Sequence, residues 1–203
     1  MKEEKVVTAV STSSAYRLLH PKLAVLLTCI DREGKANIIT LAWTMPVSME
    51  PPLIAVSIAP RRYSHEMIEE TKEFVINVPT MEIVKETFFC GRKSGRDMDK
   101  FKEIKLTSLP AKTVKAPIIK ECIAHLECKL YKQVSAGDHT LFIGEVQAAY
   151  ADENLFDDEY DLKKAKLIFH VGGNKFTTMS PEVVTPLLSA NRKKSRRVRS
   201  KVF

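Results

Sequence analysis

Short apolar runs separated by polar turns fill the first half of the chain. The runs at 23–30, 36–42 and 53–59 are rich in Leu, Ile and Val, which is typical of strands buried in a sheet. The polar, glycine-containing segment 31–35 joins the first two runs, so we expect them to pair as a hairpin. The prolines at positions 46, 51 and 52 are expected to break regular structure before the third strand.

Helical signals follow the third strand. Residues 64–72 begin with a serine, carry early acidic residues and end in lysine, a pattern that predicts a helix. Residues 80–89 begin with threonine, a good N-cap residue, and space their apolar side chains as a helix does. A strand is predicted between the two helices at 74–78. After them we expect a loop at 91–95 and a short helical turn at 96–102.

The second half of the chain predicts strands with little helix. Apolar and polar residues alternate along 122–131, which puts every second residue from Cys122 to Leu130 on one face. Residues 140–150 and 165–171 predict two more strands, and Gly172–Asn174 predicts a tight turn. About seven short strands with few local helices indicate a β-rich, mainly antiparallel barrel and not a stack of alternating strands and helices.

Charge is unevenly distributed along the 203 residues. The net charge is +7, but the last twelve residues, RKKSRRVRSKVF, hold seven Lys or Arg and no acid. The rest of the chain carries as many basic as acidic residues, so its charge does not indicate a nucleic-acid-binding domain. We therefore expect one domain over 1–180 and a basic, partly mobile tail over 181–203.

The composition also indicates a cellular compartment. No apolar stretch approaches the ~20 residues that a membrane-spanning helix needs, so no membrane association is expected. The charged N-terminal residues are not followed by the apolar core of a secretory signal. The four cysteines, at 29, 90, 122 and 128, form no CxxC pair and are expected to be reduced and mostly buried. These features predict a cytoplasmic protein without a disulfide or a metal centre.

Familiar sequence motifs of catalysis are missing. The chain contains no GxGxxG, GxxxxGK[ST], HExxH or GxSxG pattern. The histidines at 20, 65, 125, 139 and 170 are scattered, and none is spaced from another histidine or a cysteine as zinc ligands are. Nucleotide binding on a parallel sheet and a sequence-local zinc site both lose support.

Several polar positions lie beside the apolar strands. Asn37 opens the second predicted strand, and the single tryptophan, Trp43, follows that strand. Arg61–His65 joins a strand to a helix start, where free N–H groups, a positive dipole end and two arginines suit a phosphate. A second basic loop spans 91–96, and His139 follows a Gly-Asp turn. Each of these residues also has an ordinary structural explanation, so the residues alone indicate a β-rich domain with an anionic-ligand site.

An ordered series of segments resembles a known family. The series resembles the flavin reductase-like, flavoredoxin-type family between about residue 15 and about residue 178. The resemblance implies an FMN-binding split barrel of Greek-key type, usually a homodimer. No single segment is specific, and it is their order that carries the likeness: NIITLAWTMPVS (37–48), PPLIAVS (51–57), YSH (63–65), EFVINV (73–78), GRD followed by MDKF (95–101), 119–128 and GDH (137–139).

The resemblance also implies a set of site residues. Asn37 and Trp43 would lie beside the flavin, and the segment Thr40–Ser48 would line its ring, with Trp43 and Pro46 as a flat apolar wall. His139 is implied as the residue that orients a nicotinamide. The full set of cofactor-binding residues implied is Asn37, Thr40, Ala42, Trp43, Thr44, Pro46, Val47, Ser48, Arg61, Arg62, Ser64, Lys100, His139 and Phe176, with the arginines and Ser64 at the phosphate.

Three hypotheses of function follow. The first is an FMN-binding oxidoreductase that transfers electrons from NADH or NADPH, through FMN, to free flavin, ferric iron or a redox partner. The second is an electron-transfer flavoprotein that receives electrons from a protein donor and has no nicotinamide activity. The third, from another class, is a protein that binds nucleic acid or another anionic surface through the seven cations at 192–201. A solvated tail without a partner is the simpler interpretation of those cations.

Overall fold

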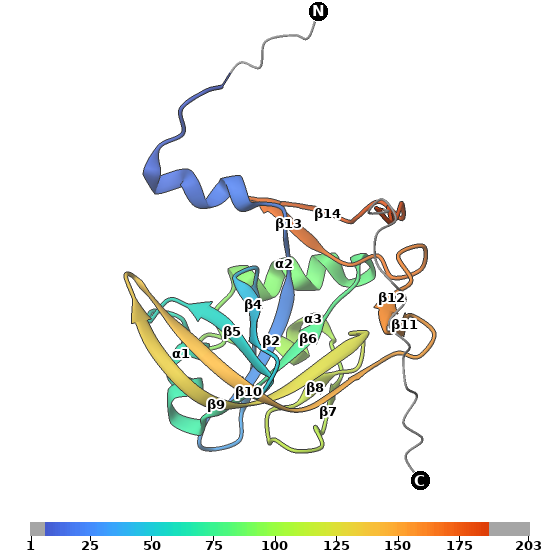
Figure 1. Cartoon of the computed structure of the whole chain (residues 1–203). Helices are drawn as coiled ribbons and strands as arrows, with labels where there is room; N and C mark the ends of the chain where they lie inside the picture. The colour runs from blue at the N-terminus through green and yellow to red at the C-terminus, as the bar shows by residue number, and fades with distance from the viewer. Residues whose placement is uncertain (1–6, 187–203) are drawn as a thin grey trace, which may run out of the picture.

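A computed structural model describes residues 7–186 of the chain. Its centre is a seven-stranded antiparallel sheet that curls into a half-open barrel (Figure 1). The strands, in spatial order, are β3 (Ala36–Leu41), β2 (Val25–Ile30), β6 (Glu73–Val78), β9 (Ala124–Ala136), β10 (His139–Ala151), β5 (Leu53–Ile58) and β4 (Thr44–Ser48). One apolar core draws buried side chains from β3 at one edge of the sheet and from β5 beside the other edge, because the curl brings these strands together.

The predicted antiparallel, β-rich fold is confirmed, and so is its first hairpin. Strands β2 and β3 pair across a turn in which Gly34 has a φ of 84°, a value that favours glycine. The predicted run 23–30 is divided, however. Its first residue belongs to β1 (Lys22–Leu23), which pairs with a strand of a second sheet. The next residue, Ala24, continues this contact: its N–H donates to the carbonyl of Ile168 at 2.9 Å.

The prediction that proline breaks regular structure was wrong at Pro46. This residue lies inside β4, which pairs with β5. Proline is tolerated there because β4 is an edge strand, whose outer N–H groups need no partner in the sheet. The register shifts between Pro46 and Ser48. The chain therefore bends at residues 42–43 and continues as strand where the sequence predicted an irregular segment.

The helices begin or end away from the predicted residues. Helix α1 (Tyr63–Thr71) agrees within a residue, but α2 (Val84–Arg92) is preceded by a 3-10 turn, η2 (Met81–Ile83). Because α2 continues to Arg92, the predicted loop 91–95 is two residues shorter. The predicted turn at 96–102 is instead α3 (Lys100–Ile104), since the side chain of Asp99 caps its first turn by accepting from the Lys102 N–H at 3.3 Å.

The long hairpin β9–β10 confirms two predicted strands, and Leu126, Cys128 and Leu130 share one apolar cluster, as the predicted single face requires. Gly137 turns the hairpin with a φ of 62°. Cys122 precedes β9, and Cys122, Ala124 and Cys128 pack in three different apolar clusters. A strand of 13 residues spans the whole barrel, so its two ends meet different layers of the molecule.

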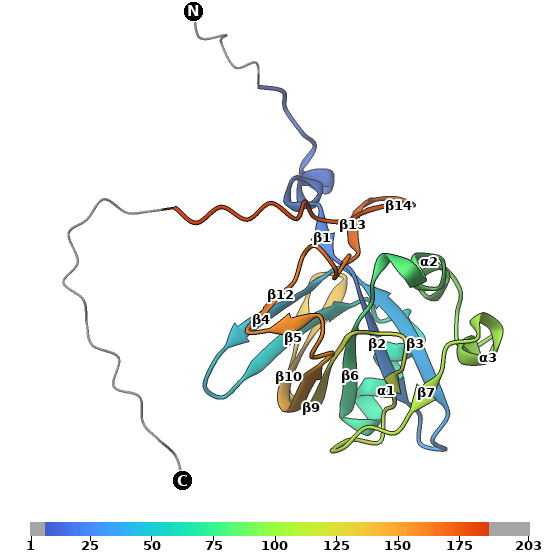
Figure 2. The ribbon, with the colours of Figure 1, turned by 90° about the vertical axis from the view of Figure 1, so that its right-hand side faces the viewer.

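A second, smaller sheet lies at the top of the barrel beside the N-terminal 3-10 helix η1 (Thr12–Leu19) (Figures 1 and 2). It contains β1, β13 (Phe169–Gly172) and β14 (Lys175–Thr177). The strand predicted at 165–171 therefore starts only at Phe169. The turn predicted at Gly172–Asn174 is confirmed and joins β13 to β14. Two further short pairs complete the elements: β7 (Ser108–Leu109) with β8 (Ile118–Ile119), and β11 (Phe156–Asp157) with β12 (Glu159–Tyr160).

A buried carboxylate fastens the connection between β7 and β8 to the barrel. Glu127, fully buried on β9, accepts hydrogen bonds from the N–H groups of Lys112 and Thr113 at 2.8 and 2.6 Å and from the Tyr150 hydroxyl at 2.8 Å. Burial disfavours the charged form, but these donors outweigh it and lower the pKa of Glu127 to about 2. The loop is thus held by an ionised group inside the fold.

The described residues contain no helix that is long and apolar enough to cross a membrane. All four cysteines are buried and free. The cations predicted to form a basic tail, at 192–201, lie outside the described residues; within the described part of 181–203, residues 181–186 are extended and exposed.

Candidate functional site

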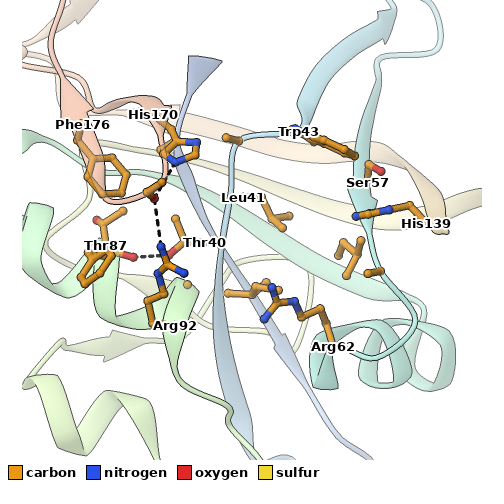
Figure 3. A pocket seen from close by; sticks show the side chains of 18 of the residues that line it. Thr40, Leu41, Trp43, Ser57, Arg62, Thr87, Arg92, His139, His170 and Phe176 are labelled. Carbon is orange, nitrogen blue, oxygen red and sulfur yellow. Dashed lines mark hydrogen bonds between the residues drawn. The ribbon is translucent and has the colours of Figure 1, made fainter. Parts of the chain in front are cut away.

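A pocket of about 340 Å³ opens between the barrel and the small sheet (Figure 3). Its floor is formed by the end of β3 and the bend that follows it, and one side by α2. Phe176 and His170, from the small sheet, lie across the pocket from Trp43 and His139. The lining residues are Tyr16, His20, Ala24, Ile39, Thr40, Leu41, Ala42, Trp43, Ser57, Ile58, Ala59, Arg61, Arg62, Thr87, Phe88, Gly91, Arg92, His139, His170, Gly173 and Phe176.

A smaller cavity of about 150 Å³, the cationic cavity, adjoins this larger pocket. The two share Ile39 and three arginines, Arg61, Arg62 and Arg92. The cationic cavity adds two lysines, at 93 and 100, and its lining contains no carboxylate. Its chemistry therefore favours an anion, whereas the larger pocket is mostly apolar and aromatic.

Three buried side-chain atoms in residues 7–186 have no hydrogen-bond partner, and all three belong to residues that line these cavities. They are Asn37 Oδ1 in the cationic cavity and Thr87 Oγ1 and His20 Nε2 in the larger pocket. An unpaired buried polar atom costs on the order of 1–3 kcal/mol, so native proteins leave few of them. Their concentration in one place indicates a site built to bind polar groups of a ligand.

Asn37 is positioned by β3 and by the start of α1. Its Nδ2 donates to Ser64 Oγ at 2.9 Å, and both side chains are buried. Gly95 covers the amide so closely that a Cβ there would collide with Oδ1. These contacts fix the amide and leave its oxygen as a free acceptor.

Two of the three arginines of the cationic cavity come from the turn that starts α1. Arg61 and Arg62 are both exposed, and Arg62 is the N-cap residue of the helix. The first N–H groups of a nine-residue helix lack partners within the helix, and its dipole adds positive potential at that end. The turn therefore offers two exposed cations and backbone donors together.

Lys100 contributes a fixed positive charge. Its Nζ donates to the carbonyls of Ile38 and Cys90 at 2.7 and 2.9 Å, and the residue is 4% exposed. Burial lowers the pKa of this ammonium. Two of the three N–H groups of its ammonium therefore hold β3 and α2 together, and the third is available to a ligand.

Arg92 closes the other side of the cavity against the turn between β13 and β14. It donates to the Gly173 carbonyl at 3.2 Å and to the side chain of Asn174, as the dashed lines of Figure 3 show in part. Its guanidinium lies 5.3 Å from the centre of the Phe88 ring. Arg92, the last residue of α2, thus links the barrel to the small sheet.

Trp43 and His139 form the opposite wall. Their ring centres are 4.9 Å apart, and Trp43 is 37% exposed. His139 Nδ1 lies 2.7 Å from Asp138 Oδ1, and because a carboxylate only accepts, the Nδ1–H is the donor. This hydrogen bond lowers the pKa of Asp138 and leaves Nε2 of the neutral imidazole as an acceptor.

The structure brings together ten of the residues expected at the cofactor. Thr40, Ala42, Trp43, His139 and Phe176 line the larger pocket, Asn37, Ser64 and Lys100 line the cationic cavity, and Arg61 and Arg62 line both. Thr44, Pro46, Val47 and Ser48 line neither, because they lie on β4, which leads away along the edge of the sheet.

Sequence reasoning missed six important lining residues: Tyr16, His20, Thr87, Phe88, Arg92 as a pocket residue, and His170. Arg92 carried a signal, since it lies in the basic loop that the sequence marked. Thr87 and Phe88 lie on α2, which packs on β3, where Thr40 Oγ1 donates to the Thr87 carbonyl at 2.5 Å. Tyr16, His20 and His170 come from distant segments that the pairing of β1 with β13 brings together, in the register Leu23–Phe169 and Lys22–His170.

Comparisons with known proteins agree with this geometry. A protein of Archaeoglobus fulgidus is 40% identical over 153 residues, which cover 75% of this chain and 86% of that protein. Flavoredoxin of Desulfovibrio vulgaris (Miyazaki F) superposes with a TM-score of 0.76 at 28% identity, covering 94% of this chain and 99% of that one.

Flavoredoxin from Methanosarcina acetivorans gives a TM-score of 0.75 at 28% identity and covers 93% of this chain and 97% of that one. The family model described as "flavin reductase like domain" matches residues 17–192. The match includes the barrel, both cavities and the small sheet. The chain therefore belongs to the flavin reductase-like family of FMN-binding flavoproteins.

Proposed function

We propose that this protein is an FMN-dependent oxidoreductase that uses NADH or NADPH to reduce free flavin, ferric iron or a redox partner. One observation carries the proposal: an aromatic, apolar pocket adjoins a cationic cavity that has no carboxylate, and three arginines line both. FMN has the same two parts, a flat ring system and a phosphate, and the solved flavoredoxins share the fold.

The residues fit the phosphate end of FMN. A phosphate near two negative charges needs arginine, lysine and backbone N–H donors, and Arg61, Arg62 and the start of α1 supply them. Ser64 and Lys100 also line the cavity proposed for the phosphate. In this proposal Lys100 acts mainly as a buried charge, because its hydrogen bonds hold Ile38 and Cys90.

The residues also fit the ring end. Trp43 and Phe176 provide aromatic walls, and Thr40 and Ala42 belong to the floor between them. The unpaired Thr87 Oγ1 offers a polar contact to the edge of the ring system. When bound, FMN supplies the capacity to accept a hydride or single electrons, which no side chain of the chain provides.

The protein's own part in such a reaction is to bind, to orient and to exclude water. His139 is held by Asp138 and packs on Trp43, so its free Nε2 is fixed at the open side of the pocket. We assign it the positioning of the nicotinamide carboxamide, whose N–H₂ suits this acceptor. Hydride transfer itself needs no acid or base on the chain.

Absorption spectroscopy tests the proposal directly. Purified protein incubated with FMN and freed of excess should show the bound oxidised-flavin band, and anaerobic NADH or NADPH should bleach it. A protein that retains no FMN would contradict the proposed cofactor. A protein that retains FMN but reacts with neither nicotinamide would contradict the reductase function and favour the second candidate.

The second candidate is an electron-transfer flavoprotein with a protein donor. It is favoured by the similarity to two flavoredoxins over nearly the full chain. The same FMN-loaded protein would then be reduced by a reduced rubredoxin- or ferredoxin-type donor and not by NADH or NADPH. Stopped-flow mixing with each donor separates the two functions.

We also propose that two copies of the chain associate. Every second residue of the segment that leaves the pocket, Trp43, Met45, Val47 and Met49, is apolar and exposed, by 37%, 59%, 41% and 95%. An edge strand with an exposed apolar face is a pairing surface, and a second copy covers it by two-fold symmetry. Light scattering should give a dimer mass for the wild type and a monomer mass for Val47→Lys. A wild-type monomer would exclude this surface as the interface.

The four buried, free cysteines lead us to propose a cytoplasmic location, where thiols stay reduced. Cell fractionation tests this.

Binding of nucleic acid through the cations at 192–201 remains the candidate of another class, and deletion of 190–203 should abolish any salt-sensitive binding without changing FMN affinity.

A further inference from the structure

The basic loop at 93–98, between α2 and α3, forms one wall of the cationic cavity, and the start of α1 forms another. Lys93, Ser94 and Gly95 line the cavity from the loop, and residues 61–64 line it from the start of α1. Gly95 lies directly against the amide of Asn37, so the loop is packed down on the cavity. The cavity is therefore bounded on one side by a segment that is neither helix nor strand.

One side chain ties this loop to α1. The Arg96 guanidinium donates to Glu66 Oε2 at 2.6 Å, and it lies 4.6 Å from the centre of the Tyr63 ring. Tyr63 is itself held in place, because its hydroxyl donates to Asp31 Oδ2 at 3.2 Å. We name the contacts of Arg96 with Glu66 and Tyr63 the Arg96 clasp. The clasp joins two walls of the cavity from outside, since Arg96 is not among the lining residues.

The loop has no other hydrogen bond to α1 in the described part of the chain. The remaining hydrogen bonds of residues 94–98 stay inside the loop. The Arg96 N–H donates to Ser94 Oγ at 3.2 Å, and the Asp97 N–H donates to the Ser94 carbonyl at 3.3 Å. A loop whose own bonds are local can move as a unit when the contact that fixes it is released.

The clasp encloses the inner part of the cavity. Cys90 and Lys100 line the cavity, yet they are only 1% and 4% exposed. A phosphate group that approaches Lys100 therefore needs the walls to part. Because Arg96 contacts α1 and not the cavity, the clasp stabilises the closed loop equally in the filled and the empty cavity. Such a contact slows entry and release together.

We propose that the Arg96 clasp is a gate on the cationic cavity and sets the rate at which FMN enters and leaves. The inference rests on the proposed function, because it describes the regulation of that same site. A closed clasp makes FMN a resident group of the protein. Release of the clasp makes FMN an exchanging ligand without a large change in its affinity.

The rate constants of FMN binding test the gate. Stopped-flow fluorescence on the full chain gives kon on mixing with FMN and koff on dilution. Arg96→Ala should raise both about tenfold and leave Kd within about twofold. The direction of kon is decisive, because the mere loss of a cation near an anion site slows association. Arg32→Ala is the matched control, since Arg32 is another exposed arginine that pairs with α1, through Glu70 at 3.4 Å.

Variants of Glu66 separate the clasp from other effects of Arg96. Glu66→Gln should accelerate exchange severalfold, and adding it to Arg96→Ala should change nothing further, because both remove the same contact. The charge-swapped pair, Arg96→Glu with Glu66→Arg, should be slower than Arg96→Glu alone. Thermal unfolding checks that each variant folds. A kon that does not rise in Arg96→Ala would overturn the proposal, and so would additive effects of the two single changes.

Labelling of Cys90 tests the clasp without FMN. This thiol lines the cavity, so N-ethylmaleimide reaches it only when the cavity or the whole fold opens. In the FMN-free chain, Arg96→Ala should label Cys90 about tenfold faster than the wild type. Cys128, buried in a different apolar cluster, should keep its wild-type rate and so excludes global opening. Peptide mass spectrometry identifies the labelled residue.

The two readouts distinguish this inference from the proposed function. A chain that binds no FMN would contradict the proposed function, and the labelling of Cys90 then decides the clasp by itself. A chain that binds FMN, but whose exchange and Cys90 labelling are unchanged in Arg96→Ala, would contradict the clasp and leave the proposed function standing.

Discussion

The cationic cavity adjoins a series of contacting rings in the larger pocket, but the two are held in place by different means. We call this series the aromatic rim; it consists of Phe88, Phe176, His170, His20, Tyr16, Trp43 and His139. The cavity is fixed by buried hydrogen bonds, those of Asn37 to Ser64 and of Lys100 to two backbone carbonyls. The rim is fixed by ring contacts and by strand pairs of two residues, and η1, which supplies Tyr16, has no buried residue. The comparison indicates a rigid half, held by buried hydrogen bonds, and a more exposed half, held by ring contacts and short strands.

Glu127 is a buried group of the barrel outside the site, and the stability it contributes is the reference for the rigid half. Replacing it with Gln should destabilise the fold by about 3 kcal/mol at neutral pH, because a pKa lowered from 4.5 to about 2 stabilises the ionised state by that amount. This stabilisation is complete above pH 4.5 and is lost as the pH falls through 2. Urea unfolding at pH 7 and at pH 2 measures it. Glu82→Gln, on the exposed η2, is the control and should have no effect.

Removing the two exposed cations of the cavity should weaken FMN binding most. The double change Arg61→Ala and Arg62→Ala is expected to raise the Kd for FMN about a hundredfold, since each arginine loses a charge-assisted hydrogen bond to phosphate. Equilibrium dialysis with FMN and with riboflavin measures the loss. Arg32→Ala, an exposed arginine paired with Glu70, is the control. An equal loss for riboflavin, which has no phosphate, would contradict the assignment.

Lys100 tests whether the rigidity of the cavity comes from its buried bonds. Lys100→Met should cost about 2 kcal/mol of unfolding free energy, because the carbonyls of Ile38 and Cys90 lose their donor. Thermal or urea unfolding gives the value, with Lys102→Met on the exposed side of α3 as the matched control. A variant as stable as the control would show that these bonds contribute little.

Trp43 is the corresponding test of the rim, with the smallest expected effect. Trp43→Leu should weaken FMN binding about fivefold through lost aromatic contact and leave stability within about 0.5 kcal/mol, since the side chain is 37% exposed. Dialysis and unfolding measure both quantities. Tyr131→Leu, an exposed aromatic on β9 outside the pocket, is the control. A large stability loss would show that the rim is as structural as the cavity.

The sequence by itself determined the barrel and most of the rigid half of the site. Alternating apolar runs and glycine turns predict antiparallel strands wherever residues close in sequence pair, as β2 does with β3. Arg61, Arg62 and Ser64 were predictable because a helix start and its cations occupy one short segment. Asn37 was marked by its polar position at the start of a strand, whereas its role and that of Lys100 came from the ordered resemblance.

Only the tertiary structure decided which residues face the pocket and which complete it. Pro46 and Val47 follow Trp43 in sequence, yet β4 carries them away from the cavity along the edge of the sheet. His20 and His170 carry no local signal at all, and they meet because a two-residue strand pairs across the length of the chain. Local patterns record short-range hydrogen bonding and burial, whereas such contacts depend on how the whole barrel closes, which no segment encodes alone.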